Sequence, residues 1–332
     1  MQETAVWYEE RKHRSFHNFL EQIWDVSPLM TSVTFAHVLL ICGCLIGLAM
    51  DGRTILGDPV WIKPLKFAIS GAIYCGTITW MLTFIRSKRW IIRTIAIGSS
   101  ILWAVEIIAI TFQASRGVRS HYNLTTPFDQ AIFGMMGTAI ILLWTINLIL
   151  IVVLIFQPFK DFAFKNSLVL GLSIAIIGGL LAYTMTSQTT PEQQAALERG
   201  ETLEFSGGHT FGAEDGGAGL PFVGWSTTHG DMRPAHFIGL HGLQLIPLLG
   251  IFINRRWRKF SVGRRTLLVY IGSGAYLGII YALYQQALNE LPITSFDLVT
   301  MSIITAVIVV CSSLWYLTIQ SGNRLAAEIA SA

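Results

Sequence analysis

Residues 131–156 read AIFGMMGTAIILLWTINLILIVVLIF and contain no charged side chain. As an α-helix this stretch would be about 39 Å long at a rise of about 1.5 Å per residue, whereas the hydrocarbon core of a bilayer is roughly 30 Å thick. An uncharged apolar run of this length is typical of a transmembrane helix. The stretch therefore predicts a helix that crosses a membrane.

The rest of the chain has the same character. Of its 332 residues, 52% are hydrophobic and only 13% are charged, against roughly 25% charged in a soluble domain. With a mean hydropathy of +0.55, this composition excludes an ordinary cytosolic protein. The apolar runs long enough to cross a bilayer are 29–50, 64–85, 91–113, 131–156, 167–185, 235–253, 266–286 and 298–319. We therefore expect an all-α, polytopic integral membrane protein with eight transmembrane helices.

The lysine and arginine residues indicate the orientation of these helices. If the N-terminus is cytoplasmic, 16 of the 23 Lys and Arg residues lie on the inner side and seven on the outer side. Cytoplasmic loops of membrane proteins carry the excess of Lys and Arg. We therefore expect both termini inside the cell. We also expect a bacterial inner (plasma) membrane, with the functional site facing outward.

Two segments lie outside the apolar runs. Residues 1–28 form a cytoplasmic segment in which Phe16, Phe19, Leu20, Ile23 and Trp24 recur at helical spacing. This pattern predicts an amphipathic helix, either on the inner membrane surface or packed on the protein's own loops. Residues 29–332 form the transmembrane domain. Within it, 186–233 is a long outer loop, rich in glycine and aromatic residues, that we expect to be an ordered lid.

A weak internal similarity relates the two parts of the transmembrane domain. Residues 63–67 (KPLKF) begin the second apolar run and resemble 233–237 (RPAHF), which begin the sixth. Residues 84–90 (FIRSKRW) resemble 252–257 (FINRRW) at the ends of the same two runs. Two four-helix halves in parallel orientation would produce this pattern. Chance similarity between helix ends is the alternative.

Glu106 and His241 are the strongest candidates for catalytic residues. A charged side chain within a span costs a few kcal/mol or more, so each such residue is a functional candidate. Glu106 lies roughly 10 Å, and His241 roughly 9 Å, below the outer boundary by helix rise. We therefore expect both to face one cavity in the outer half. Gln113 shares the helix face of Glu106, and Gln244 shares that of His241. The alternative is that both are structural, with Glu106 protonated and each hydrogen-bonded between helices.

Other polar residues gather near the same depth. The candidates for substrate binding are Lys66, Gln113, Arg119, Gln244, Tyr281 and Tyr284. The candidates for metal ligands are His121, His209, His236 and His241, because imidazole binds zinc, iron and copper. For Lys66 the alternative is snorkelling to lipid head groups, and for the tyrosines it is ordinary helix packing.

Three classes of function use such a site. The first is a membrane-embedded enzyme that depends on a metal or haem, such as an oxidoreductase, with a polar site in the outer half beneath the glycine-rich loop. The second is a proton-coupled transporter of a small anionic substrate, in which Glu106 carries the proton. The third is a non-catalytic sensor or assembly subunit that binds a lipid or quinone. The expected partners are the bilayer and a small molecule, with no nucleic acid, and the cofactor is unknown, with haem or a transition metal as the candidates.

Overall fold

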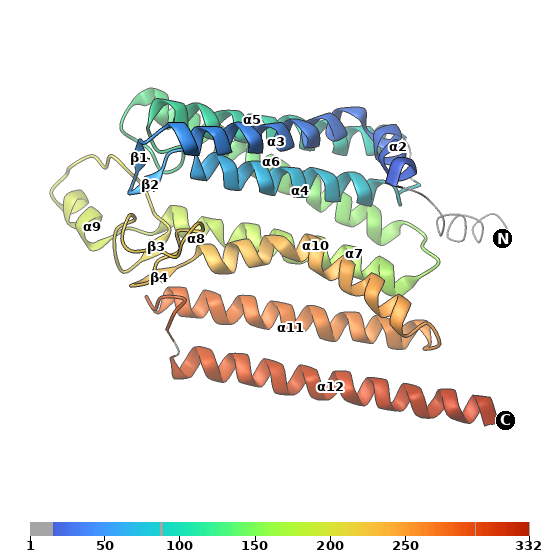
Figure 1. Ribbon diagram of the computed structural model, residues 1–332. Helices are drawn as coiled ribbons and strands as arrows, with labels where there is room; N and C mark the ends of the chain where they lie inside the picture. Colours follow the sequence, from blue (N-terminus) through green and yellow to red (C-terminus); the bar gives the residue numbers. More distant parts are fainter. Residues whose placement is uncertain (1–15, 87–88, 296, 332) are drawn as a thin grey trace.

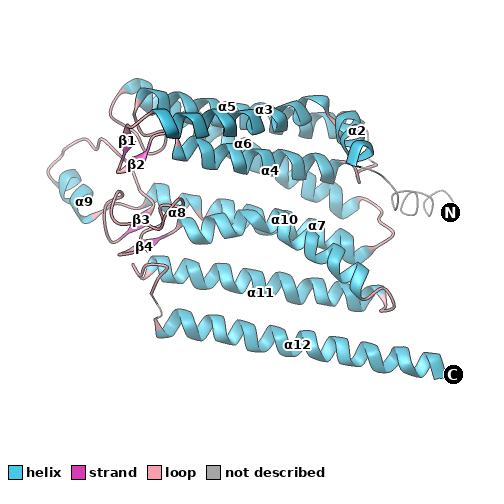
Figure 2. Ribbon diagram, viewed as in Figure 1, coloured by secondary structure: helices cyan, strands magenta, loops and turns pink. Residues whose placement is uncertain are grey.

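The computed structural model describes residues 16–86, 89–295 and 297–331. Within these residues almost all regular structure is helical, and the strands are two-residue pairs (Figures 1 and 2). Eight helical segments are long and apolar enough to cross a membrane, which confirms the predicted all-α polytopic fold. They are Pro28–Met50 (α3), Ile62–Leu82 (α4), Arg89–Arg116 (α5), Pro127–Phe156 (α6), Phe162–Ser187 (α7, Phe162–Leu180, with α8, Ala182–Ser187), Arg233–Arg256 (α10), Val262–Leu288 (α11) and Leu298–Arg324 within α12 (Leu298–Ser331).

Most of the helices extend past the apolar runs that predict them, because polar residues continue the helix outside the hydrocarbon. Caps define several of the starts. The Ser27 hydroxyl accepts a hydrogen bond from the backbone N–H of Met30, and Pro28 begins α3. Thr126 and Pro127 begin α6 in the same way, with the hydroxyl accepting from Asp129 N–H. Such caps satisfy backbone donors that the first turn leaves without partners.

The eight helices form two halves with the same pairing pattern (Figure 1). In the first half, α3 packs on α4, α4 on α5, α5 on α6, and α3 also reaches α5. In the second half, α7, α10, α11 and α12 repeat these four pairings in the same order. The similar sequence segments at the starts of α4 and α10 thus occupy equivalent positions. This pairing pattern is the one that two parallel four-helix halves would have.

Small residues bring α7 and α10 close together in the second half. A Cβ atom added to Gly178 would lie 2.5 Å from the carbonyl carbon of Gly239, which is closer than non-bonded atoms approach. The imidazole of His236 donates from Nδ1 to the carbonyl oxygen of Gly178 at 2.7 Å. Glycine at these positions therefore permits backbone-to-backbone packing, as is common between membrane helices.

The two ends of the bundle differ. The described chain begins and ends at the same end, where Phe16–Val26 (α2) packs on α3 and α4 (Figure 1). The amphipathic helix predicted near the N-terminus is thus present from Phe16, and residues 1–15 lie outside the described part. We call this the inner end, following the Lys and Arg distribution. The opposite, outer end carries the segment 188–232.

The segment 188–232, called the outer loop below, links the two halves. It contains Pro191–Glu198 (α9), Thr210–Phe211 (β3) and Gly230–Asp231 (β4), and β3 pairs antiparallel with β4. Its backbone bonds to the loop that follows α5: Leu124 N–H donates to Glu204 O at 2.8 Å, and Ser206 N–H donates to Tyr122 O at 3.0 Å. The short hairpin of Thr54–Ile55 (β1) and Asp58–Pro59 (β2) lies at the same end. The outer loop connects α8 to α10, which both belong to the second half. It nevertheless covers the outer end of the first half.

Candidate functional site

A cavity of about 420 Å³ lies at the outer end, beneath the outer loop. Its membrane-side wall comes from the first turns of α4 and the outer end of α5, and its cover comes from the outer loop and the β1–β2 hairpin. Phe67, Phe222 and Phe237 provide apolar surface, while charged side chains from both halves line the rest. The cavity thus combines apolar and charged walls, as small-molecule sites usually do.

Three cationic side chains line this cavity without a carboxylate partner. Among the described residues, no carboxylate lies within ion-pair distance of Lys63, Lys66 or Arg119. The ammonium of Lys66 donates to the carbonyl oxygen of Val223 at 3.2 Å, and the guanidinium of Arg119 lies over the Phe205 ring at 4.0 Å. Burial lowers the pKa of Arg119 from its ordinary value, although Asp215 and Glu214 act to raise it. These cations retain donor capacity for an anion.

A fourth cation, Arg233, is neutralised and holds the outer loop in place. Its guanidinium pairs with the fully buried Asp231 carboxylate at 2.6 Å and donates to Gly224 O at 2.5 Å. Asp231 also accepts from the backbone N–H of Ser226 at 2.7 Å. This network connects the start of α10 to the part of the loop that covers the cavity. Arg233 therefore has a structural role in shaping the site.

A histidine–aspartate pair forms another part of the wall. Nδ1 of His209 lies 2.8 Å from Oδ2 of Asp215, and Oδ1 of Asp215 accepts from the backbone N–H groups of His209 and Thr210. Burial acts to raise the pKa of Asp215, but the His209 ring and these hydrogen bonds hold it well below its ordinary value. The ionised carboxylate fixes the proton of a neutral His209 on Nδ1, which leaves Nε2 as an acceptor.

His121 is the second histidine in the cavity, and its ring contacts Lys63. Nδ1 of His121 lies 3.1 Å from Nζ of Lys63 and 3.0 Å from Oγ of Ser120. Because an ammonium can only donate, Nδ1 is the acceptor. Burial lowers the pKa of His121 well below its ordinary value, and the nearby positive charge of Lys63 acts in the same direction. His121 is therefore a neutral hydrogen-bonding residue at neutral pH.

The structure places Glu106 beneath this cavity rather than in its wall. Glu106 is 1% exposed on α5, and neither carboxylate oxygen has a hydrogen-bond partner among the described residues. Lys63 is close enough for the charges of the two groups to interact. Lys63 lines the cavity and acts on Glu106 through space, but no hydrogen bond or ion pair joins the two among the described residues. Sequence reasoning did not select Lys63, although its position directly before Pro64, at the start of a span, was a usable signal.

His241 does not join this site. It is exposed on α10 and lies 3.3 Å, through Nδ1, from the side-chain oxygen of Gln244. Gln244 in turn donates to the hydroxyl of Thr77 on α4 at 3.2 Å. Neither residue lines the cavity. The expectation that Glu106 and His241 face one cavity therefore has no support, because equal depth on two helices does not make their side chains converge.

Three other predicted binding residues also lie outside the cavity lining. Gln113 is fully buried and donates to Asp129, which also pairs with Arg116 at 2.6 Å, so this group ties α5 to α6. Tyr281 is exposed on α11, and Tyr284 packs against a small apolar cluster near the outer loop. The predicted residues that the structure does bring together are Lys66, Arg119, His121 and His209.

The predicted metal ligands do not form a metal site. Within the described part of the chain, no group of three or more His, Cys, Asp or Glu side chains could hold a metal ion. His236 uses Nδ1 to bond Gly178 O, His209 uses Nδ1 to bond Asp215, and His241 lies elsewhere. Metal binding by these four histidines is thus not supported, because no three potential ligands converge among the described residues.

Comparison of the chain with protein-family models, with curated proteins and with solved structures found no match.

Proposed function

We propose that the protein binds a small anionic molecule with an apolar part in the cavity beneath the outer loop. The observation that supports this most is that Lys63, Lys66 and Arg119 line one partly enclosed cavity without carboxylate partners among the described residues. An unpaired charge in a partly buried site is costly unless a counter-ion meets it. The aromatic walls favour a ligand that is not purely ionic.

The acidic residues of the cavity are consistent with this proposal. Asp215 is engaged by His209 and by backbone N–H groups, so it does not neutralise the lysines directly. Asp58 and Glu214 also line the cavity, and neither forms an ion pair within the described residues. They could accept hydrogen bonds from hydroxyl or amino groups of the same ligand. The ligand class is therefore an anion that also carries donors or an apolar group.

A thermal-shift experiment tests the binding site. The full-length protein in a non-ionic detergent is titrated with inorganic phosphate and with octyl phosphate, and Lys66→Gln and Arg119→Gln are compared with the wild type. Each variant removes a charged donor, so we expect roughly tenfold or greater weakening of octyl phosphate binding. Lys160→Gln, an exposed change at the inner end, is the matched control. Equal binding by all four proteins would refute the proposal.

A second candidate function is acid–base catalysis on the bound molecule. It is favoured by the pairing of His209 with Asp215 on the cavity wall, because a carboxylate that fixes one imidazole nitrogen leaves the other available as a general base. No hydrogen bond within the described residues occupies Nε2 of His209. This reaction class uses only residues of the chain itself and includes hydrolysis of a phosphate or carboxylate ester.

Binding and turnover can be separated for this candidate. Chromogenic short-chain phosphate and carboxylate esters serve as substrates, and octyl phosphate serves as the binding probe. We expect His209→Gln to retain octyl phosphate binding but to lower ester turnover by roughly a hundredfold or more. Turnover that survives in His209→Gln would remove His209 from the mechanism. That outcome would leave the proposed binding site unaffected, because octyl phosphate binding is measured separately.

A further inference from the structure

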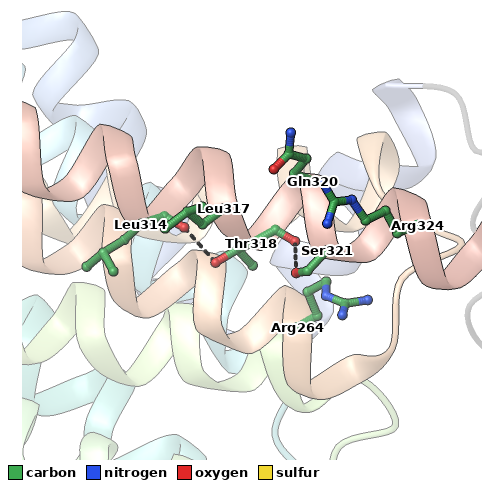
Figure 3. Close-up of a pocket in the computed structure, with 7 residues that line it drawn as sticks. All are labelled: Arg264, Leu314, Leu317, Thr318, Gln320, Ser321 and Arg324. Carbon is green, nitrogen blue, oxygen red and sulfur yellow. Dashed lines mark hydrogen bonds between the residues drawn. The ribbon is translucent and has the colours of Figure 1, made fainter.

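A second, largely open cavity lies at the surface of the inner end, between α11 and α12. It has a volume of about 620 Å³ and is lined by side chains from both helices (Figure 3). The lining residues are Arg264, Leu314, Leu317, Thr318, Gln320, Ser321 and Arg324. We call this cavity the inner notch. It is far from the outer loop and does not share any residue with the site described above.

Arg264 is held in the inner notch by an aromatic ring rather than by an acid. Its guanidinium lies 5.4 Å from the centre of the Phe260 ring. Phe260 itself is buried, and a Cβ added to Gly322 would lie 2.6 Å from the ring, so glycine lets α12 pack directly on Phe260. The neighbouring Arg265 differs, because it pairs with Asp161 at 2.5 Å. Of the two adjacent arginines, only Arg264 lacks a carboxylate partner among the described residues.

Arg324 adds a second cation on the opposite wall, and Figure 3 shows it near Gln320 above Arg264. No ion pair involves Arg324 within the described side chains. The polar groups between the arginines are partly used: the hydroxyls of Thr318 and Ser321 donate to backbone carbonyls of α12, and Gln320 donates to the Tyr316 hydroxyl. The free donors of the notch are therefore mainly the two guanidinium groups.

The depth of the inner notch matches the boundary between hydrocarbon and head groups. Along α12 from Leu298, Leu314 lies about 24 Å and Arg324 about 39 Å away at about 1.5 Å per residue. A hydrocarbon core of roughly 30 Å therefore ends between them. The leucines would face acyl chains, and Arg324 would lie among head groups. Trp257 and Trp315, whose rings are 5.8 Å apart, lie nearby at the same end, as interfacial aromatic residues commonly do.

Lipid can reach this notch because α12 stands at the edge of the bundle (Figure 1). Its main packing partner is α11, and most of its membrane-spanning surface is exposed. Leu314 and Leu317 are 48% and 57% exposed and form an apolar wall that continues along the helix. A ligand in the notch could therefore have an anionic group between the arginines and a hydrocarbon part against α12.

We propose that the inner notch binds an anionic phospholipid of the inner leaflet. Its phosphate lies between Arg264 and Arg324, and an acyl chain packs along Leu314 and Leu317. Charge complementarity selects the head group, and the apolar wall selects a lipid over a soluble anion. Basic pockets on the cytoplasmic side of transmembrane helices commonly bind anionic head groups in this way. The bound lipid would fill the space between α11 and α12 and stabilise their packing.

Thermal unfolding of the full-length protein in a non-ionic detergent tests this proposal. Phosphatidylglycerol and phosphatidylcholine with identical acyl chains are compared, and soluble glycerol phosphate serves as a head-group-only probe. We expect phosphatidylglycerol to raise the melting temperature most. The double variant Arg264→Gln/Arg324→Gln should bind it roughly tenfold more weakly, because two charged donors are lost. The double variant Arg264→Lys/Arg324→Lys, which keeps the charge, should recover part of the effect.

The test includes a control variant with the same change in charge and an independent count of bound lipid. Arg258→Gln/Lys259→Gln changes the net charge of the same end equally but replaces no lining residue of the notch, so it should respond as the wild type does. Native mass spectrometry counts retained phosphatidylglycerol molecules independently of stability. Equal retention by the wild type and the Arg264→Gln/Arg324→Gln variant would overturn the proposal. An equal shift with phosphatidylcholine, or with glycerol phosphate, would also overturn it.

Discussion

Glu106 is a buried acid without a hydrogen-bond partner among the described residues. Leaving a buried polar group unsatisfied costs about 1–3 kcal/mol. A residue that served only to stabilise the fold would not bear this cost. Glu106 lies one helical turn from Ile110, which lines the cavity, and the charge of Lys63 acts on it through space, which instead indicates a role in the charge balance of the site.

The cost of burying this carboxyl group can be measured from the stability of Glu106 variants. We expect Glu106→Leu to be as stable as the wild type, or more stable by about 1–3 kcal/mol, because it removes an unsatisfied buried carboxyl group. Glu106→Gln keeps the shape and the polarity and serves as the comparison. Thermal unfolding in detergent measures both variants. If Glu106→Leu is strongly destabilised while Glu106→Gln is not, the carboxyl group makes an interhelical hydrogen bond and its role is structural.

His121 makes the outer end sensitive to acid. Burial keeps the pKa of His121 well below 6.5, so the folded protein binds this proton less readily than the unfolded chain does. The stability that neutral His121 contributes is therefore present above about pH 6.5 and is lost as the pH falls towards the folded pKa.

We expect the melting temperature of the wild type to fall between about pH 7 and about pH 5, and His121→Gln to show a smaller fall. Glutamine can still accept a hydrogen bond from Lys63 but does not titrate in this range. His229→Gln is the control, because His229 is a half-buried histidine of the same cavity whose Nδ1 lies beside the Thr228 hydroxyl rather than beside Lys63. An unchanged pH dependence in His121→Gln would show that other groups control the acid response.

At the scale of elements, the α7–α10 pair depends on glycine. Gly178 and Gly239 face each other so closely that a side chain on either would overlap the other backbone. The hydrogen bond from His236 to Gly178 O joins the same two helices. The pair also carries the start of α10, from which Arg233 holds the outer loop. Packing between these helices therefore affects the cavity.

We expect Gly178→Ala to destabilise the protein by about 1–3 kcal/mol, which is typical of overpacking. Gly137→Ala on α6 is a matched control, because a Cβ there would meet no atom within 4 Å. Replacing glycine by alanine in an open helical position is neutral or stabilising by up to about 1 kcal/mol. Both variants are compared by thermal unfolding. A Gly178→Ala protein as stable as Gly137→Ala would mean that the helices can separate without cost.

At the scale of the whole molecule, eight spans place both ends of the described chain, Phe16 and Ser331, on one side. The assignment of that side to the cytoplasm depends on the Lys and Arg distribution. Thr202 in the outer loop and Lys259 between α10 and α11 are both exposed and lie at opposite ends. They are therefore suitable reporters of orientation.

We expect Thr202→Cys to react with an impermeant thiol reagent from outside intact cells, and Lys259→Cys to react only after permeabilisation. The background is a variant without Cys42, Cys44, Cys75 and Cys311. The opposite pattern would invert the topology and place the cavity in the cytoplasm. Labelling of both positions from one side would contradict the eight-span fold.

The sequence by itself determined the eight spans and the common side of the two termini. A bilayer demands about 20 apolar residues per helix, so length and hydropathy are sufficient for this part of the fold. Helix rise also predicted similar depths for Glu106 and His241. It could not determine in which direction each side chain points around its helix. That direction depends on packing, which buried Glu106 and left His241 exposed.

The sequence predicted Lys66, Arg119, His121 and His209 as candidates, but only the tertiary structure decided which side chains share the cavity. Lys63 and His121 come from the first half, whereas His209, Asp215 and Arg233 come from the outer loop and the start of α10. No periodicity relates these residues, because the path of a long loop depends on its own hydrogen bonds to distant backbone. The outer loop crosses from one half to the other and closes over the cations, and this non-local contact creates the cavity.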